Sequence, residues 1–353
     1  MGQDTAGRPS TMAQEIAEQP DALARTLAAL VPRAAEVHAL AAGTDRVLLV
    51  ARGSSDHAAL YAHYLLGLRA GLLTTSGSPS FATAYEADLD LQGTLAIAIS
   101  QSGATQEIVG TLAWAKASGA RTLAITNVAG SPLFHTADLT LVTEAGNERA
   151  LPATKSHTAQ LTAMAFVGAV LGREPRDLDA LQAVPEAVAV VLATGTASVD
   201  EVAGLLVPTR SVVVTGRGYA SATAREIALK LQETCELPAV GLSWADLLHG
   251  PLALLDERTP ALLIAPPSGP VLAGTVAVAR RLAERGAPVF GIGGDGTFAA
   301  ACTQVLPASD LPEHLAPITS VVPGQLLAES LARQLGLDPD HPRGLRKVTQ
   351  TDE

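Results

Sequence analysis

Three apolar segments of this 353-residue chain occur twice, and the copies are separated by a constant spacing. Each segment reads as a short buried strand, and each second copy lies about 166 residues after the first, which indicates a duplicated domain. Helical patterns lie between the strands, and this alternation predicts parallel sheets with helices on both faces. The matching pairs are 46–53 with 211–218, 95–103 with 261–269, and 122–126 with 288–292.

We therefore expect an α/β protein of two tandem αβα sandwiches with parallel, flavodoxin-like sheets. Strands of the first sheet are predicted at 46–51, 72–76, 94–100, 121–126 and 138–142. Helices are predicted at 12–30, 33–42, 57–70, 104–118 and 155–171. The predicted divisions are an N-terminal helical segment (1–44), a first domain (45–178), a second domain (179–336) and a C-terminal tail (337–353).

The composition limits the partners that the chain can bind. Apolar residues make up 48% and aromatic residues 3% of the chain, so the core must consist of Ala, Leu and Val. The net charge is −11 and the Lys and Arg residues are scattered, which argues against nucleic acid and anionic membranes as partners. A phosphorylated small molecule stays open, because backbone N–H groups can hold it locally.

Other patterns predict the compartment and argue against cofactors. Cys235 and Cys302 are too few for a disulfide framework and stand in apolar stretches typical of core residues. No segment approaches about 18 uninterrupted apolar residues and no signal peptide opens the chain, so we expect a soluble cytoplasmic protein. No zinc-type spacing occurs, which predicts no metal. The stretch 291–296 fits G-x-G-x-x-G, but no acidic residue closes a long βαβ unit after it, so we expect no nucleotide cofactor.

A hydroxyl-rich turn is the strongest candidate for a ligand site. The sequence Ser-Gln-Ser-Gly-Ala-Thr at 100–105 directly follows an apolar strand, and a helix is expected to begin at Ala104. The N–H groups and the dipole of a helix N-terminus, together with three hydroxyls and an amide, suit an oxygen-rich anion such as a phosphate ester. The alternative interpretation is that Ser102 only caps the helix.

A second turn of the same kind follows the strand at 46–51. The sequence Arg-Gly-Ser-Ser-Asp-His at 52–57 places Ser55 beside a helical stretch. Neighbouring parallel strands carry their ligand loops at the same edge, so Ser55 and the 100–105 loop are predicted to converge on one anion. Pro-Pro-Ser-Gly at 266–269 replaces the hydroxyl-rich turn in the second copy, so we expect the first domain to hold the anion.

Three groups of side chains offer proton transfer or carbonyl chemistry. One helix face carries Glu226, Lys230 and Glu233. This face is either a solvated row of salt bridges or part of a ligand site, the second because Glu233 is near the helix end. His249, expected on an apolar helix before a Gly-Pro break, is either structural or a proton carrier. Lys347 lies in a basic tail that is either solvated or folded over a site where the lysine could form a Schiff base.

These motifs occur in the order found in the tandem SIS (sugar isomerase) domain family. From about residue 45 on, the chain resembles the isomerase half of glucosamine-6-phosphate synthase, and most closely the stand-alone glucosamine-6-phosphate deaminases of the SIS type. Six motifs in register carry the resemblance: Gly53-Ser54-Ser55, Ser100-Gln101-Ser102-Gly103, Ala153-Thr154-Lys155, Glu226 to Glu233, Leu248-His249-Gly250-Pro251 and the Lys347 tail.

The resemblance implies a role for each candidate residue. Glu233 would be the base that moves a proton between C1 and C2 of the sugar, and Lys230 would assist at the hydroxyls. His249 would open the ring, reaching in from the partner subunit of a homodimer, and Lys347 would be the Schiff-base lysine. The residues that would bind the phosphate and the sugar are Ser55, Ser100, Gln101, Ser102, Thr105 and, through its backbone, Leu151.

The chain departs from the synthase pattern in two places and lacks one of its parts. Asp56 stands where the synthase has an aromatic residue, and Arg346, which we also expect to contact the substrate, stands where it has Ala. The synthase carries a glutaminase domain with an N-terminal Cys nucleophile, whereas residue 2 here is Gly2. We therefore expect no glutamine hydrolysis on this chain, and conversion of glucosamine 6-phosphate to fructose 6-phosphate and ammonia.

Two alternatives remain open. A related enzyme could aminate fructose 6-phosphate with free ammonia, or could deaminate or isomerise another hexosamine phosphate. A non-catalytic phosphosugar sensor would keep Ser55 and the 100–105 loop but would not need Glu233, His249 and Lys347 together. A sensor would also need an output module, and no helix-turn-helix fits before residue 45.

Overall fold

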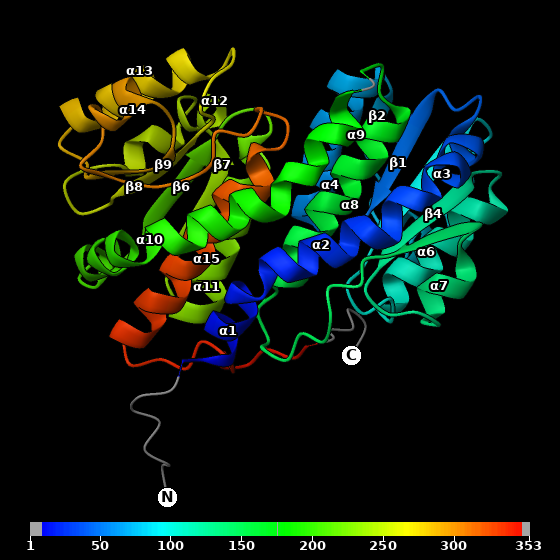
Figure 1. Cartoon of the computed structure of the whole chain (residues 1–353), viewed down its shortest axis with the longest axis horizontal. Coiled ribbons are helices and arrows are strands. Elements are labelled where there is room, and N and C mark those ends of the chain that lie inside the picture. The colour runs from blue at the N-terminus through cyan, green and yellow to red at the C-terminus, as the bar shows by residue number, and fades with distance from the viewer. Residues whose placement is uncertain (1–8, 175, 348–353) are drawn as a thin grey trace, which may run out of the picture.

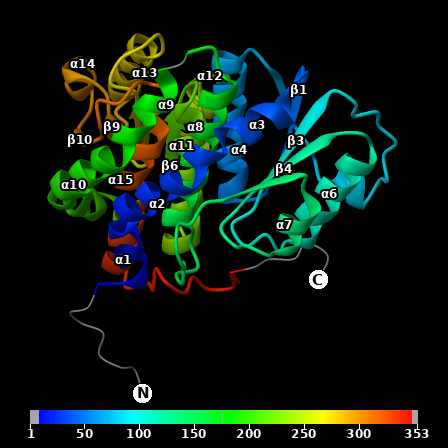
Figure 2. The same cartoon turned by 45° about the vertical axis from the view of Figure 1, so that its right-hand side comes forward.

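The computed structural model describes residues 9–174 and 176–347, and its framework is a pair of five-stranded parallel sheets (Figures 1 and 2). The first sheet consists of β1 (Arg46–Val50), β2 (Leu73–Ser76), β3 (Thr94–Ile99), β4 (Arg121–Thr126) and β5 (Leu139–Val142). The second consists of β6 (Val212–Gly216), β7 (Ala239–Ser243), β8 (Ala261–Ala265), β9 (Val289–Gly293) and β10 (Gln304–Leu306). The strand orders, β2-β1-β3-β4-β5 and β7-β6-β8-β9-β10, correspond, which confirms the predicted α/β class with two flavodoxin-like sheets.

Helices pack around both sheets and between them (Figure 1). Those in the first half are α1 (Thr11–Ala17), α2 (Gln19–Leu30), α3 (Ala34–Ala41), α4 (Ser54–Leu65), α5 (Ser80–Thr83), α6 (Gln106–Ala117), α7 (Pro132–Thr136) and α8 (Lys155–Leu171). Those in the second half are α9 (Arg176–Ala180), α10 (Val184–Leu206), α11 (Ala220–Cys235), α12 (Trp244–Leu247), α13 (Leu272–Glu284), α14 (Gly296–Ala299) and α15 (Ala316–Gln334).

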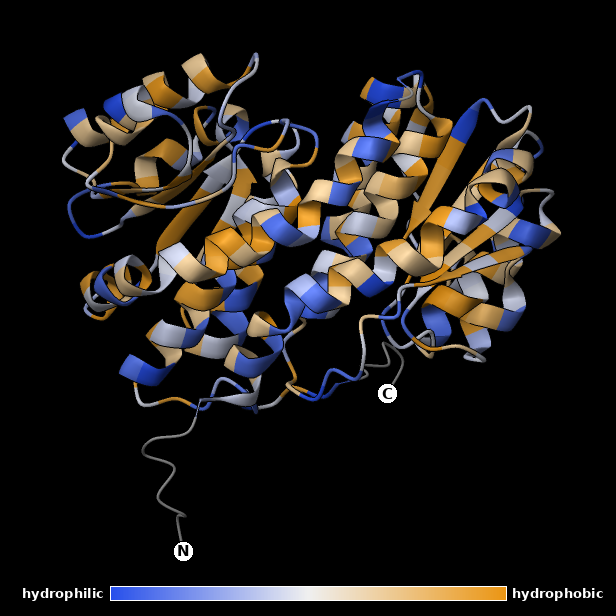
Figure 3. Cartoon of the chain, in the orientation of Figure 1, coloured by the Kyte–Doolittle hydropathy of each residue, from blue (hydrophilic) through white to orange (hydrophobic). Residues whose placement is uncertain are grey.

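The central strand β3 shows how the sheet forms its core. Its side chains alternate between two apolar clusters, with Ile97 and Ile99 in the cluster that α2, α4 and α8 share, and Ala96 and Ala98 in the cluster with α6. All four are fully buried, as expected for a parallel strand covered on both faces. Figure 3 shows the same pattern, with the strands of both sheets among the most hydrophobic segments.

One apolar cluster joins the two domains. It runs from Met12 in α1 through α4 and α8 to α11 and α15, without interruption at the domain boundary. Helix α4 of the first domain packs directly on α11 of the second. The turn that opens α4 and the charged face of α11 are therefore held against each other, and this contact positions the site described below.

The segment Arg176–Leu206 is the one described stretch with the length and composition of a membrane-spanning helix. It comprises α9, the short 3-10 helix Leu181–Ala183 and α10, and 33% of its most apolar window is buried. Helix α10 packs along α15 and α2 (Figure 1). Helices of this length and apolar composition also occur in the cores of water-soluble proteins.

Several helix boundaries differ from the prediction. The helix predicted at 12–30 is divided at Glu18, because Pro20 starts a new helix. The helix predicted from residue 57 begins at Ser54, because Gly53, with φ of 57°, turns the chain directly out of β1. The helix expected to begin at Ala104 begins at Gln106, which leaves 100–105 as a loop.

Two strands of the second sheet were not predicted. In β7, Gly241 interrupts the apolar pattern, and a Cβ atom there would lie 2.6 Å from the Cα of Arg225 in α11. The glycine is needed because α11 lies close to the sheet at this point, and the same glycine makes the segment harder to predict as a strand. Strand β10 spans three residues at the sheet edge, too few for a period to be read.

We predict that Gly103→Ala destabilises the fold more than Gly130→Ala does. Both glycines have positive φ, 61° and 73°, so both substitutions introduce similar backbone strain. A Cβ on Gly103 would also lie 2.7 Å from Ser131 Cβ and 2.8 Å from Thr126 Oγ1, whereas Gly130 has no atom within 4 Å. Denaturant unfolding should show an additional loss of about 1–3 kcal/mol for Gly103→Ala, and equal losses would contradict the close packing of this loop.

Candidate active site

A cavity of about 440 Å³ lies at the carboxyl ends of β1 and β3. These strands are adjacent, and the connections leave them in opposite directions, which is where open α/β sheets bind ligands. All of the predicted phosphate- and sugar-binding residues line it, together with Glu233, Arg346 and Lys347. Its full lining is Arg52, Gly53, Ser54, Ser55, Ile99, Ser100, Gln101, Ser102, Thr105, Ile108, Glu148, Leu151, Ala153, Glu233, Arg346 and Lys347.

The 100–105 loop is shaped by its own hydroxyls. Ser100 Oγ accepts a hydrogen bond from Gly103 N at 3.3 Å, and Ser102 Oγ accepts one from Ala104 N at 3.2 Å. Thr105 is the N-cap residue of α6, but no side-chain hydrogen bond caps this helix. Ser102 therefore stabilises the loop rather than capping α6, and the loop presents its hydroxyl groups to the cavity.

The corresponding edge of the second sheet has a much smaller cavity. The cavity near Ala265 and Pro266 has a volume of about 10 Å³, too small for a sugar phosphate. The two domains therefore differ at this edge as the sequence predicted, since Pro-Pro replaces the first two polar residues of the loop.

The charged face of α11 is buried rather than solvated. Glu226 and Lys230 are fully buried, and Lys230 Nζ lies 3.5 Å from Glu226 Oε1 and forms an ion pair with Glu233. Burial alone would lower the pKa of Lys230, but the two carboxylates outweigh it and raise the pKa above its ordinary value. Lys230 is therefore a fixed ammonium group, and Glu233, whose side chain is 22% exposed, is the carboxylate that this group presents to the cavity.

Helix α4 holds this charge pair from the other domain. Ser54 Oγ donates to Glu226 Oε1 at 2.9 Å, and His57 Nδ1 lies 2.7 Å from Glu226 Oε2. Burial would raise the pKa of Glu226, but His157, Lys230 and His57 together lower it well below its ordinary value. Sequence analysis did not single out Ser54 or His57, and their position next to Ser55 was the one available signal.

Lys347 reaches the cavity along the C-terminal tail. Its Nζ donates to Ala150 O at 2.6 Å and lies 3.1 Å from Glu148 Oε2, a fully buried carboxylate. The tail is anchored by Asp340, whose carboxylate accepts the N–H groups of Thr11 and Met12 at 2.7 Å each. Residues 348–353 of the predicted tail lie outside the described part of the chain.

The N-terminal helices support the loop that faces Lys347. Glu15, buried in α1, accepts hydrogen bonds from the N–H groups of Arg149 at 2.6 Å and Ala150 at 3.2 Å. The buried Lys155 lies 3.7 Å from Glu15 and 2.5 Å from Glu18. The site thus depends on residues that sequence analysis missed. Glu15 bonds backbone N–H groups more than 130 positions away, and Glu148 pairs with Lys347, 199 positions away.

His249 is not at the cavity. It is exposed, it follows the end of α12 rather than lying on a helix, and its backbone N–H bonds to Asp246 O at 3.0 Å. The short helix ends at Leu247 because Gly250, with φ of 136°, turns the chain away. That a partner subunit brings His249 to the site stays a prediction.

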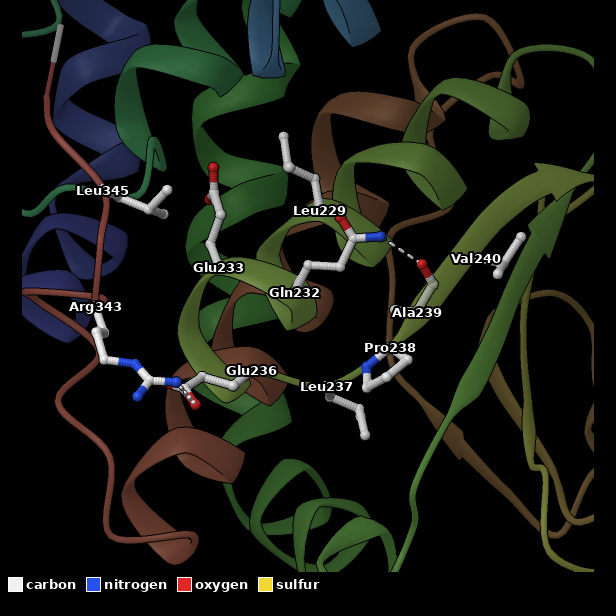
Figure 4. A pocket seen from close by; sticks show the side chains of 10 residues that line it. All are labelled: Leu229, Gln232, Glu233, Glu236, Leu237, Pro238, Ala239, Val240, Arg343 and Leu345. Carbon is white, nitrogen blue, oxygen red and sulfur yellow. Dashed lines mark hydrogen bonds and ion pairs between the residues drawn. The ribbon is translucent and has the colours of Figure 1, made fainter. Parts of the chain in front are cut away.

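A second cavity of about 770 Å³ adjoins Glu233 (Figure 4). Figure 4 shows Glu233, near the end of α11, and Glu236, directly after the helix, on the side of the tail residues Arg343 and Leu345. Gln232 points the other way, and its amide donates to Ala239 O at 2.5 Å. Arg343 Nη2 pairs with Glu236 Oε2 at 3.2 Å. The tail lines both cavities, with Arg343 and Leu345 in this one and Arg346 and Lys347 in the cavity of about 440 Å³. Glu233 lines both cavities and is therefore accessible from each.

The arrangement is suited to proton transfer on an anionic ligand. The two hydroxyl-rich loops offer donors for an anion, and the Glu233 carboxylate can accept a proton beside the fixed Lys230 ammonium. Burial raises the pKa of Cys235 to about 11 and that of Cys302 to about 12, so neither is an activated thiol. Within the described residues, no cluster of three His, Cys, Asp or Glu could hold a metal ion.

Comparison with known proteins places these features in a family context. The SIS domain family matches residues 42–168 and 205–332. The glutamine–fructose-6-phosphate aminotransferase (isomerizing) of Thermococcus kodakarensis is 37% identical over 98% of this chain and 58% of its own length. The chain therefore spans less than two thirds of this relative.

Solved structures show the same fold. The C-terminal domain of glucosamine-fructose-6-phosphate aminotransferase from Francisella tularensis has a TM-score of 0.88 and 26% identity, covering 96% of this chain and 100% of that one. Glucosamine-6-phosphate deaminase from Thermotoga maritima has a TM-score of 0.77 and 24% identity, covering 97% and 100%, and this similarity shows the fold alone.

We predict a pH-dependent contribution of Glu148 to stability. Burial acts to raise its pKa, but the charge of Lys347 and hydrogen bonds from Ser156 and Thr154 outweigh it and hold the pKa below 4.5. A lowered pKa in the folded state stabilises the protein above the pKa of the unfolded chain, and this stabilisation is lost as the pH falls through the folded-state value. Glu148→Gln should therefore reduce the free energy of unfolding by about 1–3 kcal/mol at pH 7.

Denaturant unfolding from pH 7 down to pH 3 checks this expectation. The difference between the wild type and Glu148→Gln should shrink as the pH falls below about 4.5, the ordinary value for a glutamate. Glu144→Gln, on the same loop but exposed, is the control and should show little difference. A Glu148→Gln effect that is constant with pH would contradict the charge pairing.

Proposed function

This chain belongs to the SIS domain family and is homologous to the isomerase half of glutamine–fructose-6-phosphate aminotransferase, and from that premise we propose that it is a hexosamine-phosphate isomerase. More specifically, we propose that it converts glucosamine 6-phosphate to fructose 6-phosphate and ammonia. The observation that carries the proposal is the position of Glu233, beside a buried ammonium and in the same cavity as two hydroxyl-rich loops. A phosphosugar sensor would need the loops but not this acid–base pair.

In the proposed reaction, Glu233 removes the proton from C2 of the open-chain sugar and returns it at C1. The enolamine formed in between becomes a C2 imine, and water adds to it, so that fructose 6-phosphate and ammonia are released. Lys230 stabilises negative charge that develops on the neighbouring oxygen, because its ammonium is fixed between two carboxylates. A positioned acid–base group of this kind typically contributes about 10²–10⁴ in rate.

Lys347 lines the same cavity as Glu233, and we propose that it adds to the C2 imine as an alternative to direct attack by water. Its Nζ donates hydrogen bonds to Ala150 O and to Glu148 Oε2. In the proposed step a proton would pass from Nζ to the Glu148 carboxylate as the nitrogen adds to the C2 imine. Addition of this nitrogen would expel ammonia and form a Schiff base, which water then hydrolyses. His249 of a partner subunit would supply the acid that opens the ring in a homodimer.

Deamination is the proposed direction because of the chemistry of ammonia. Neither cysteine lines either cavity around Glu233, and both thiols have raised pKa values, so neither is a candidate nucleophile for glutamine at this site. An amination that takes ammonia from solution would meet mostly protonated ammonia at neutral pH, which is not nucleophilic. The names of the relatives favour amination as the second candidate, since the relative from Thermococcus kodakarensis is 37% identical over 98% of this chain.

The test is an assay of the pure protein with each set of reactants. We expect ammonia and fructose 6-phosphate from glucosamine 6-phosphate, slow amination of fructose 6-phosphate at high ammonium, and no reaction with glutamine. Glutamine-dependent synthesis would overturn the assigned direction in favour of a synthase. Absence of ammonia from every hexosamine phosphate tested would favour a sensor or a plain isomerase.

We predict that Glu233→Gln lowers kcat by about 10²–10⁴ while the Kd for fructose 6-phosphate stays nearly unchanged. The amide keeps the shape of the side chain but cannot accept the proton. Glu284→Gln, an exposed residue at the end of α13, is the control and should have wild-type kinetics. Retention of more than a tenth of the wild-type rate by Glu233→Gln would remove Glu233 from the role of base.

We predict that two inactive variants restore activity when their subunits exchange. In a mixed dimer of Glu233→Gln and His249→Ala chains, one of the two sites has both residues intact if His249 comes from the partner subunit. Random exchange should then recover about one quarter of the wild-type activity. The control pairs Glu233→Gln with Lys230→Met, whose residues share α11 and should not complement. No recovery after demonstrated exchange would count against a shared site.

A further inference from the structure

We propose that Arg52 contributes directly to binding the phosphate group, as an affinity-determining residue for phosphorylated sugars. This inference rests on the proposed function, because it assumes that the cavity at the ends of β1 and β3 takes a sugar phosphate. In the sequence, Arg52 opens the second hydroxyl-rich turn and corresponds to Arg217 in the internal repeat, but neither pattern gave it a role of its own.

Arg52 lies at the wall of the cavity, at the start of the 52–57 turn. One residue separates it from the end of β1, and it lines the cavity together with Ser55 and the loop residues Ser100 and Thr105. Its guanidinium pairs with Glu107 in the first turn of α6, with Nε 3.1 Å from Oε2 and Nη2 3.0 Å from Oε1. The Arg52 side chain is 50% exposed, whereas that of Glu107 is 7% exposed.

The pairing with Glu107 uses one edge of the guanidinium. A guanidinium has five N–H donors, and its planar fork can face two acceptors along two edges. The Nε and Nη2 atoms face Glu107, and within residues 9–174 and 176–347 no group accepts a hydrogen bond from Nη1. The Nη1–Nη2 edge is therefore available to a second oxyanion, and a phosphate offers the matching pair of oxygens.

The positive charge of Arg52 would favour a phosphate group in a protein whose net charge is negative. The chain has a net charge of −11, and the side chains of the two phosphate loops at 54–55 and 100–105 are neutral. A phosphate monoester carries close to two negative charges at neutral pH. Glu107 is nearly buried and fixes the guanidinium at the cavity wall, so Arg52 supplies a preorganised positive charge rather than a flexible one.

The experiment measures the Kd of fructose 6-phosphate and of inorganic phosphate by calorimetry. Arg52→Met should raise both Kd values by about 10- to 100-fold, the usual effect of losing a charge-assisted hydrogen-bond pair, while kcat changes less than about threefold. Arg52→Lys keeps a positive charge for Glu107 but not the fork, so it should fold normally and still bind phosphate more weakly than the wild type. Binding of unphosphorylated fructose should be equally weak in all three proteins.

A matched control and two outcomes decide the proposal. Arg46→Met removes an exposed arginine from the opposite end of β1, where it bonds Thr94 and Gln92 O, and should leave both Kd values unchanged. If the wild type binds fructose 6-phosphate but Arg52→Met and Arg52→Lys bind it equally well, Arg52 has only a structural role and this proposal fails alone. If the wild type binds neither phosphate compound, the proposed function fails with it.

Discussion

The buried charge cluster on α11 is the interaction on which the rest of the site depends. Two fully buried charges, on Glu226 and Lys230, would be strongly destabilising if either lost its partners. Their partners come from two domains. Ser54 and His57 of α4, in the first domain, bond Glu226, whereas Glu233 of α11, in the second, pairs with Lys230. Satisfying these charges requires α4 and α11 to pack as they do, and that packing places Glu233 beside the phosphate loops.

The two ends of the chain are used to complete the same cavity. Helix α1 supports the loop that carries Glu148 through Glu15, and its own N-terminus is bonded by Asp340 of the tail. The tail then continues to Lys347, which bonds back to the loop. These contacts form a closed chain of interactions from the N-terminal helix to the C-terminal tail. A change in α1 is therefore expected to reach the cavity through backbone hydrogen bonds rather than through direct contact with a ligand.

Prediction from the sequence succeeded where the signal was local. The boundaries of the strands in the first sheet were placed within one residue, because most of these strands are short runs of apolar or β-branched residues with a turn after them. The 100–105 loop was found because its hydroxyls and its glycine are adjacent in the sequence. Strand β7 was missed because Gly241 serves the approach of α11, and His57 was missed because its partner, Glu226, lies in the other domain. Local patterns carry no information on such partners.

The sequence by itself determined the α/β class, the duplication, the hydroxyl-rich loops and the shared face of the α11 charges, because all of these follow from short-range periodicity and turn chemistry. Only the tertiary structure decided that this face is buried, that Ser102 shapes its loop instead of capping α6, and that Arg52 pairs with Glu107 at the cavity. The physical reason is that burial and pairing depend on which surfaces meet. At Glu226 the surfaces that meet come from segments more than 150 residues apart, since Ser54 and Glu226 are separated by 172 positions.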